Sequence, residues 1–170
     1  MMENVECFNH KNESLNTVIP RDQMKNAAEY FRVIHAWIIN EKGQYLVQKR
    51  AKKDDLQPFM WAFTTGMLKP KENPLDGIIR EVLEELSFST SKKDWQLEKI
   101  VSTHVHPYKT HTYVFKCHLK TLVNLKPNDE VSELSWWSFE AIQTAIAAGE
   151  FWDYPHLLND STYFLGGPHE

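Results

Sequence analysis

Three glutamates near the middle of the chain have the residue type and the spacing of metal ligands. Glu81, Glu84 and Glu85 lie in a segment, 74–87, whose apolar residues recur with the period of a helix. At about 100° per residue, the three side chains fall on one face of that helix. Mg²⁺ and Mn²⁺ prefer oxygen ligands, and residues three or four apart on a helix are neighbours. The alternative is a solvated face on which Arg80 and Glu84 form an ion pair.

The opposite face of the same helix is apolar and can be buried. Asn73 suits the N-cap and Pro74 the first helical position, so we expect the helix to begin there and to end near Ser87. One side then packs on the protein while the other concentrates negative charge. The apolar positions are Leu75, Ile78, Ile79, Val82, Leu83 and Leu86.

The loop before the helix favours the metal site. Gly66 is followed after five residues by Glu72, and seven further residues separate Glu72 from the run Arg80 to Glu85. This spacing resembles the signature of the Nudix hydrolase family, and six of its seven fixed residues match over Gly66–Phe88. Ser87 stands where the family has its last glycine. A serine there can adopt the left-handed conformation of a helix end at a cost of about 1 kcal/mol.

The resemblance implies a metal-dependent hydrolase that cleaves a diphosphate linkage in a nucleoside diphosphate derivative. Mg²⁺ or Mn²⁺ would activate a water for attack on phosphorus and offset the negative charge of the substrate. By the same resemblance, the metal ligands are Glu81, Glu84, Glu85 and the backbone carbonyl of Gly66. The expected partner is therefore a small-molecule diphosphate.

The resemblance also implies supporting roles for other residues of the motif. Arg80 would hold Glu81 or Glu72 in place, and Glu72 would tie the loop to the helix and contact metal through water. Members of the family use as general base either a glutamate of this helix or an acid on a later loop. The loop candidates are Asp129, Glu130 and Glu133. We favour Glu130, with a solvated turn acid as the alternative.

Several residues outside the motif are candidates for contact with the substrate. Arg50 and Lys49 end a predicted strand, where a basic residue of a Nudix-like chain can contact phosphate; surface charge is the alternative. Lys49 alternates to the other face of the strand and is the weaker candidate. Phe63 is expected in the core or, as the weaker choice, as a platform for a base. Three histidines are expected on the surface or in the substrate pocket: His104, His106 and His111.

The flanking segments predict an α+β fold. Apolar and β-branched runs bounded by turn residues indicate strands, and capped amphipathic segments indicate helices. Their order resembles the Nudix α/β/α sandwich, with a mixed central β-sheet and the loop and helix described above. The expected strands are two around 10–13, then 30–39, 44–50, 61–65, 95–106, 110–119 and 131–137. The expected helices are 21–28, 74–87, 138–148 and 154–165.

Length and composition set the domain organisation and limit the partners. The 170 residues predict one domain, 1–170, with an N-terminal arm at 1–29 and a frayed tail at 166–170. The net charge of −4 disfavours a nucleic-acid polymer as partner. The sequence has no apolar run of membrane-spanning length and no signal-peptide pattern, so we expect no membrane partner and a cytoplasmic location. A two-fold homodimer is the prior for a small enzyme.

Two other functions are compatible with a Nudix-like chain. The strand order and the N-terminal arm also resemble the isopentenyl-diphosphate isomerases of the Nudix family, which use a cysteine just before the motif glycine. Thr65 stands at that position, so the protonation chemistry lacks its thiol. A non-catalytic nucleotide-binding Nudix module typically lacks at least one helix glutamate, whereas Glu81, Glu84 and Glu85 are all present. The hydrolase is therefore preferred.

Overall fold

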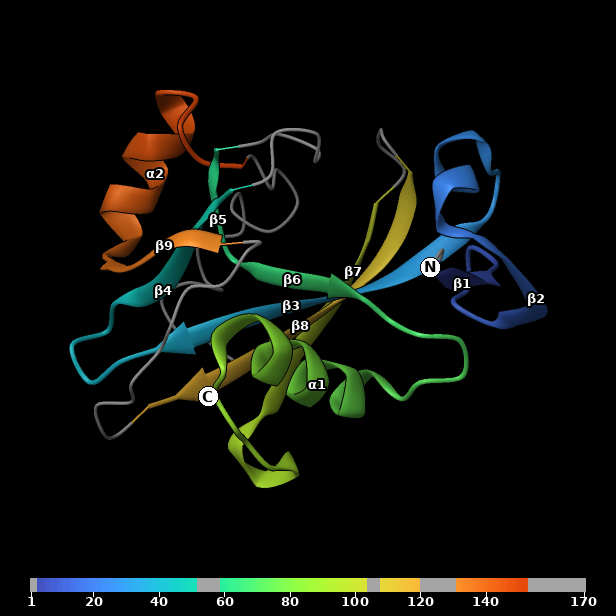
Figure 1. Cartoon of the computed structure of the whole chain (residues 1–170), viewed down its shortest axis with the longest axis horizontal. Coiled ribbons are helices and arrows are strands. Elements are labelled where there is room, and N and C mark those ends of the chain that lie inside the picture. The colour runs from blue at the N-terminus through green and yellow to red at the C-terminus, as the bar shows by residue number, and fades with distance from the viewer. Residues whose placement is uncertain (1–2, 52–58, 104–107, 120–130, 153–170) are drawn as a thin grey trace.

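A computed structural model describes residues 3–51, 59–103, 108–119 and 131–152 of the chain (Figure 1). The predicted helix at 154–165, the tail at 166–170, and Asp129, Glu130, His104 and His106 lie outside these residues. Within the described residues, no helix has the length and apolar character needed to cross a membrane.

Nine strands and two α-helices make up the described fold. The strands are β1 Asn4–Phe8, β2 Ser14–Pro20, β3 Tyr30–Ile39, β4 Tyr45–Arg50, β5 Trp61–Ala62, β6 Thr64–Met67, β7 Gln96–Thr103, β8 Lys109–His118 and β9 Val131–Trp137. The helices are α1 Pro74–Leu86 and α2 Phe139–Ala147, with 3₁₀ helices η1 Arg21–Asn26 and η2 Lys92–Asp94. The expected strand at 61–65 is wrong in detail. The chain breaks at Phe63 into two strands, and Gly66 lies within β6, not after it.

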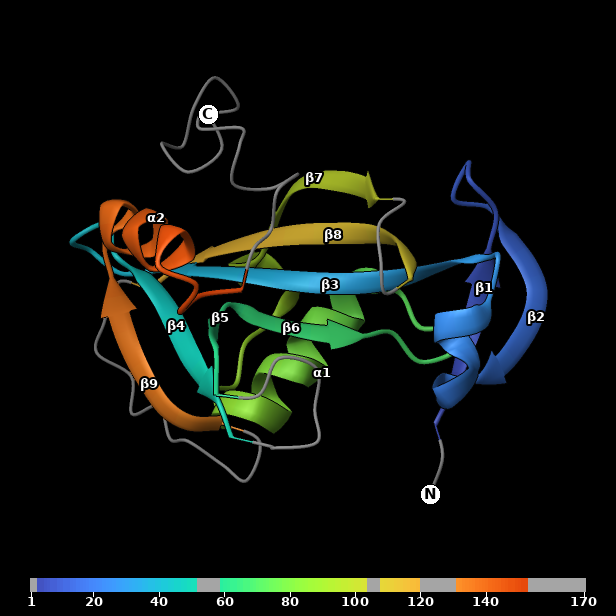
Figure 2. The same ribbon diagram turned by 90° about the horizontal axis from the view of Figure 1, so that it is seen from above.

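Strand β3 is the centre of one mixed sheet. One of its edges pairs along its whole length with β8 in parallel, from Tyr30–Lys109 to Ile39–His118. Its other edge pairs antiparallel with three strands in turn, β1 at its start, β6 in its middle and β4 at its end. The sheet continues from β1 to β2 and from β4 to β9, while β7 pairs with β8 (Figure 2).

Alternate side chains of β3 build two cores on opposite faces of the sheet. Ile34 and Ile38 pack with α1 on one face, whereas Trp37 packs with α2 on the other. The two helices lie on opposite sides of the sheet in Figure 2. Helix α1 buries Ile78, Val82 and Leu86, and α2 buries Ile142 and Ala145. The predicted α/β/α sandwich with a mixed sheet is therefore confirmed.

The limits of α1 follow from its end residues. Asn73 caps the first turn, because its Oδ1 accepts a hydrogen bond from the amide of Leu75 at 2.9 Å. Ser87 ends the helix in the left-handed conformation with φ 55°, the conformation that glycine adopts more easily. The buried residues of α1 fix its rotation about its axis, so the glutamate-rich face turns away from the sheet core.

Candidate functional site

Gly66 brings strand β6 into close contact with the glutamate face of α1. Because β6 pairs with β3 at Ile34–Gly66, the position of Gly66 is fixed by the centre of the sheet. A Cβ on residue 66 would lie 2.6 Å from Cγ and 2.7 Å from Oε1 of Glu81, far inside an ordinary contact. With Glu81 in this position only glycine fits at residue 66, and the Gly66 backbone lies directly beside the Glu81 carboxylate.

Arg80 joins the loop before the helix to the helix itself. Its Nε and Nη2 donate to both oxygens of Glu72 at 2.7 and 2.8 Å, a bidentate ion pair. Its Nη1 donates to Glu81 at 3.0 Å and to Glu84 at 3.1 Å. Its Nη2 also donates to the carbonyl of Met67 at 3.1 Å. Arg80 thus contacts Glu72 and Glu81, both expected as its partners, and also forms the i, i+4 pair with Glu84 that the alternative interpretation expected.

Glu72 is held as a carboxylate by its surroundings. Burial raises the pKa of Glu72. Hydrogen bonds from the Arg80 side chain and from the amide of Lys69, together with the positive charges of both side chains, lower it by more. The pKa of Glu72 is therefore below its ordinary value. The same carboxylate raises the pKa of Arg80, which stays charged at any relevant pH. The loop is tied to the helix by an ion pair that is mostly buried.

The remaining glutamates offer oxygen donors on the same helix face. The side chain of Glu81 is 13% exposed, that of Glu84 is 55% exposed, and Glu85 is half-buried. In the part of the chain that the structure describes, no three acidic, histidine or cysteine side chains already converge on one point. A divalent cation would have to compete with Arg80 for Glu84 and Glu81. The oxygen donors of the three glutamates and of the Gly66 carbonyl are the kind that fit such an ion.

Two of the candidates for substrate binding, Lys49 and Arg50, end strand β4, and the third, Phe63, lies between β5 and β6. Lys49 is 3.9 Å from Glu133 of β9, an exposed ion pair. The guanidinium of Arg50 lies 5.1 Å from the centre of the Trp152 ring. Phe63 is 1% exposed and packs in the core beneath α2. Its burial favours the core role over the platform for a base.

His111, expected on the surface or in the substrate pocket, is buried between the N-terminal hairpin and the sheet. His111 is 1% exposed, because its ring stacks on Tyr30 at 4.6 Å between centroids. Its Nδ1 lies 2.6 Å from Ser102 Oγ and its Nε2 lies 2.8 Å from the carbonyl oxygen of Asn9. His111 therefore fastens the N-terminal hairpin to β8, a long-range contact that periodicity could not reveal.

Glu6 is a residue of this neighbourhood that sequence reasoning missed. It lies in β1 and accepts a hydrogen bond at 2.7 Å from the amide of Lys71, next to Glu72 in the loop. The two residues are 65 positions apart, and no motif signals their contact. A charged residue between the apolar Val5 and Cys7 of an N-terminal strand was the local anomaly that could have drawn attention to it.

Known proteins match both the sequence and the fold. The family model described as the NUDIX domain matches residues 29–158. An uncharacterized Nudix hydrolase of Listeria innocua serovar 6a is 26% identical over 155 residues, 90% of each chain. Nucleoside triphosphatase NudI of Enterobacter sp. strain 638 is 25% identical over 121 residues, 66% of this chain and 86% of NudI. The structure of DR0079 from Deinococcus radiodurans has the same fold, with a TM-score of 0.73 and 22% identity over 88% of this chain and 91% of that chain.

Proposed function

Because the chain belongs to the Nudix hydrolase family, we propose that it cleaves a diphosphate linkage in a nucleoside diphosphate derivative. One observation carries the proposal: the Arg80 guanidinium binds Glu72, Glu81 and Glu84 at once, directly beside Gly66. A solvated helix face needs none of these restraints, since an exposed i, i+4 pair contributes only about 0.3–0.5 kcal/mol. The restraints suit a site whose carboxylates must keep fixed positions.

The cofactor in this proposal is Mg²⁺ or Mn²⁺. Glu81, Glu84 and Glu85 would hold the ion together with the backbone carbonyl of Gly66. A bound divalent ion offsets the charge of a diphosphate and lowers the pKa of a bound water. These ions prefer hard oxygen donors such as carboxylates. Without a cation, a cluster of carboxylates would repel an anionic substrate.

Arg80 and Glu72 orient the carboxylates in this mechanism and do not contact the substrate. Arg80 holds Glu81 on the Gly66 side and also donates a hydrogen bond to the more exposed Glu84. Glu72 neutralises Arg80, so that the guanidinium does not cancel the negative charge of the helix face. A glutamate of α1 or an acid of the later loop, Glu130 or Glu133, would accept the proton of the attacking water. Glu133 is paired with Lys49, which makes Glu130 or α1 the stronger choice.

The nucleotide part of the proposal draws support from a relative. NudI of Enterobacter is a nucleoside triphosphatase, so a substrate with a nucleoside and linked phosphates is the reasonable class for this chain. Arg50 is the basic candidate for substrate phosphate, with Lys49 as the weaker one. The isomerase alternative stays the weaker one, because the residue before Gly66 is Thr65, which has no thiol. Thr65 lies in β6, opposite His35 of β3.

A substrate panel tests the proposal. Purified protein is incubated with Mg²⁺ or Mn²⁺ and with nucleoside di- and triphosphates, dinucleotides, nucleotide sugars and isopentenyl diphosphate. We expect phosphate or nucleotide release from one nucleotide class, loss of release in EDTA, and at least a hundredfold decrease for Glu84→Gln. The matched control is Glu140→Gln in the first turn of α2, which should keep full activity. No release from any nucleotide by the wild type would refute the hydrolase, and turnover of isopentenyl diphosphate alone would support the isomerase.

A further inference from the structure

The loop between β6 and α1 contains a turn with an unfavourable residue. The amide of Glu72 donates to the carbonyl of Lys69 at 3.0 Å, which closes a four-residue turn over Pro70 and Lys71. Lys71 has φ 66°, the left-handed conformation that glycine adopts in a type II turn. A lysine in this conformation needs support from elsewhere in the structure. The turn matters because it delivers Glu72 to Arg80.

Glu6 of the N-terminal hairpin supplies this support. Its Oε1 accepts the hydrogen bond from the Lys71 amide at 2.7 Å, and its Oε2 lies 3.9 Å from Lys71 Nζ. Its Oε2 also accepts a hydrogen bond from the Ser14 hydroxyl of β2. Glu6 is 8% exposed, and Asn16 binds Lys71 Nζ at 3.1 Å from the same hairpin. Figures 1 and 2 both show the loop reaching the end of the molecule that carries β1 and β2.

We propose that Glu6 is a positioning residue of the active site, which acts through the Lys69–Glu72 turn. The path has three steps, each a short contact. Glu6 holds the Lys71 amide, the turn places Glu72, and Glu72 binds Arg80 in bidentate fashion. Arg80 in turn binds Glu81 and Glu84. This inference rests on the proposed hydrolase function, for which the same glutamates bind the metal ion.

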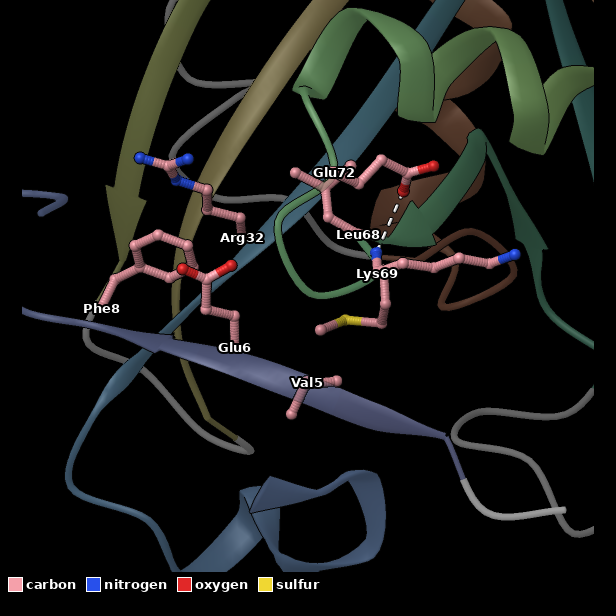
Figure 3. A pocket seen from close by; sticks show the side chains of 8 residues that line it. Val5, Glu6, Phe8, Arg32, Leu68, Lys69 and Glu72 are labelled. Carbon is pink, nitrogen blue, oxygen red and sulfur yellow. Dashed lines mark hydrogen bonds between the residues drawn. The ribbon is translucent and has the colours of Figure 1, made fainter. Parts of the chain in front are cut away.

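The junction between hairpin and loop is not itself a ligand site. Figure 3 shows a narrow space lined by Glu6 and Arg32 on one side and by Lys69 and Glu72 on the other. That space is about 10 Å³, at most one water molecule. The matched NUDIX domain begins at residue 29, so the hairpin lies outside it. The hairpin thus adds to the matched domain a contact that fixes the loop.

Kinetics of Glu6→Ala test the role directly. Loss of the hydrogen bond frees the turn, so we expect kcat to fall about tenfold and the Mg²⁺ concentration for half-maximal activity to rise about tenfold. KM for the nucleotide should stay within about twofold, because Glu6 does not contact substrate in this scheme. The control is Glu3→Ala, which removes the exposed ion pair with Arg21 from the same hairpin. Equal behaviour of the two variants would overturn the inference.

Rescue separates a role in positioning from a general loss of structure. Lys71→Gly should restore kcat and metal activation in the Glu6→Ala background, because glycine adopts the positive φ without help. Glu6→Gln keeps one oxygen that can accept the Lys71 amide hydrogen, so it should retain most of the activity. If Glu6→Ala loses activity and Lys71→Gly fails to restore it, the effect does not pass through the turn and the inference is wrong.

Two readouts on the metal-free protein keep this test apart from the proposed function. Hydrogen exchange of the Lys71 amide should be at least about tenfold faster in Glu6→Ala than in wild type. Titration with Mn²⁺ alone should show about tenfold weaker binding by the variant, again restored by Lys71→Gly. A wild type that hydrolyses no substrate would end the hydrolase proposal. Unchanged exchange or unchanged Mn²⁺ affinity in Glu6→Ala would end the inference on Glu6, whether or not the wild type is active.

Discussion

Replacement of Gly66 by alanine should damage activity far more than stability. The added Cβ would lie 2.6 Å from Cγ of Glu81, whereas ordinary contacts begin near 3.4 Å. The obstacle is a side chain, which can rotate away, and the backbone of β6 keeps its pairing with β3. Glu81 would therefore move by roughly 1 Å or more and lose its hydrogen bond from Arg80, a displacement that can cost about a hundredfold in rate.

The expected changes can be separated in two assays. Hydrolysis of the best substrate from the panel should fall about a hundredfold in kcat. The free energy of unfolding in urea should fall by only about 1–2 kcal/mol, the cost of one lost hydrogen bond and minor repacking. Mn²⁺ titration of the metal-free protein should show weaker binding in parallel with the loss of kcat.

Gly43→Ala is the matched control for the glycine substitution. Gly43 lies in the turn before β4 with φ 75°, and a Cβ there would meet nothing within 4 Å. This variant should lose about 1 kcal/mol of stability from backbone strain and keep its activity. Retention of more than half of the activity by Gly66→Ala would contradict this prediction, and so would a loss of several kcal/mol of stability with unchanged Mn²⁺ binding.

Three further predictions concern Arg80, Ser87 and His35. Arg80→Lys should lower kcat by about a hundredfold and the free energy of unfolding by about 2 kcal/mol, because lysine cannot form the bidentate pair with Glu72; a rate near wild type would contradict this. Ser87→Gly should raise the free energy of unfolding by about 1 kcal/mol at unchanged activity, since glycine adopts φ 55° without strain; a lower melting temperature would argue against it. Burial lowers the pKa of His35 to about 3, so the unfolded chain, with an ordinary pKa near 6.5, binds the proton first as the pH falls. The stability that depends on neutral His35 is thus complete above about pH 6.5, and about 2 kcal/mol of it should be lost by pH 5. The free energy of unfolding of His35→Leu should lack this pH-dependent loss. If the free energies of unfolding of the two proteins, measured in urea, changed equally between pH 5 and pH 7, the assignment to His35 would be contradicted.

The elements were predictable where local chemistry decides them. The strands at 30–39 and 131–137 have the predicted bounds. β-branched and aromatic residues dominate 30–39, whereas apolar and polar residues are interspersed over 131–137 up to the helix cap Ser138. Helix α1 begins at Pro74 behind the Asn73 cap, as expected. The error at 61–65 has a tertiary cause. Phe63 turns into the core beneath α2 and interrupts the strand, which a local pattern of apolar residues cannot show.

In the candidate site too, local spacing was predictable and contacts between elements were not. Spacing alone placed Glu81, Glu84 and Glu85 on one helix face, since the helical period is fixed by backbone geometry. Spacing also indicated that Arg80 would contact a glutamate, but not that it would bind three at once. That arrangement needs the loop to fold back on the helix, which depends on packing between elements.

The family, the amphipathic helix and the identity of its carboxylates can be read from the residues alone, because these depend on residue type and local period. The folded chain was needed to show that Gly66 lies against Glu81, that His111 is buried beneath the hairpin, and that Glu6 holds the loop at Lys71. The physical reason is that each of these contacts joins residues from different elements, up to about one hundred positions apart. Their distances are set by the register of the sheet and the packing of α1, and no local propensity encodes either one.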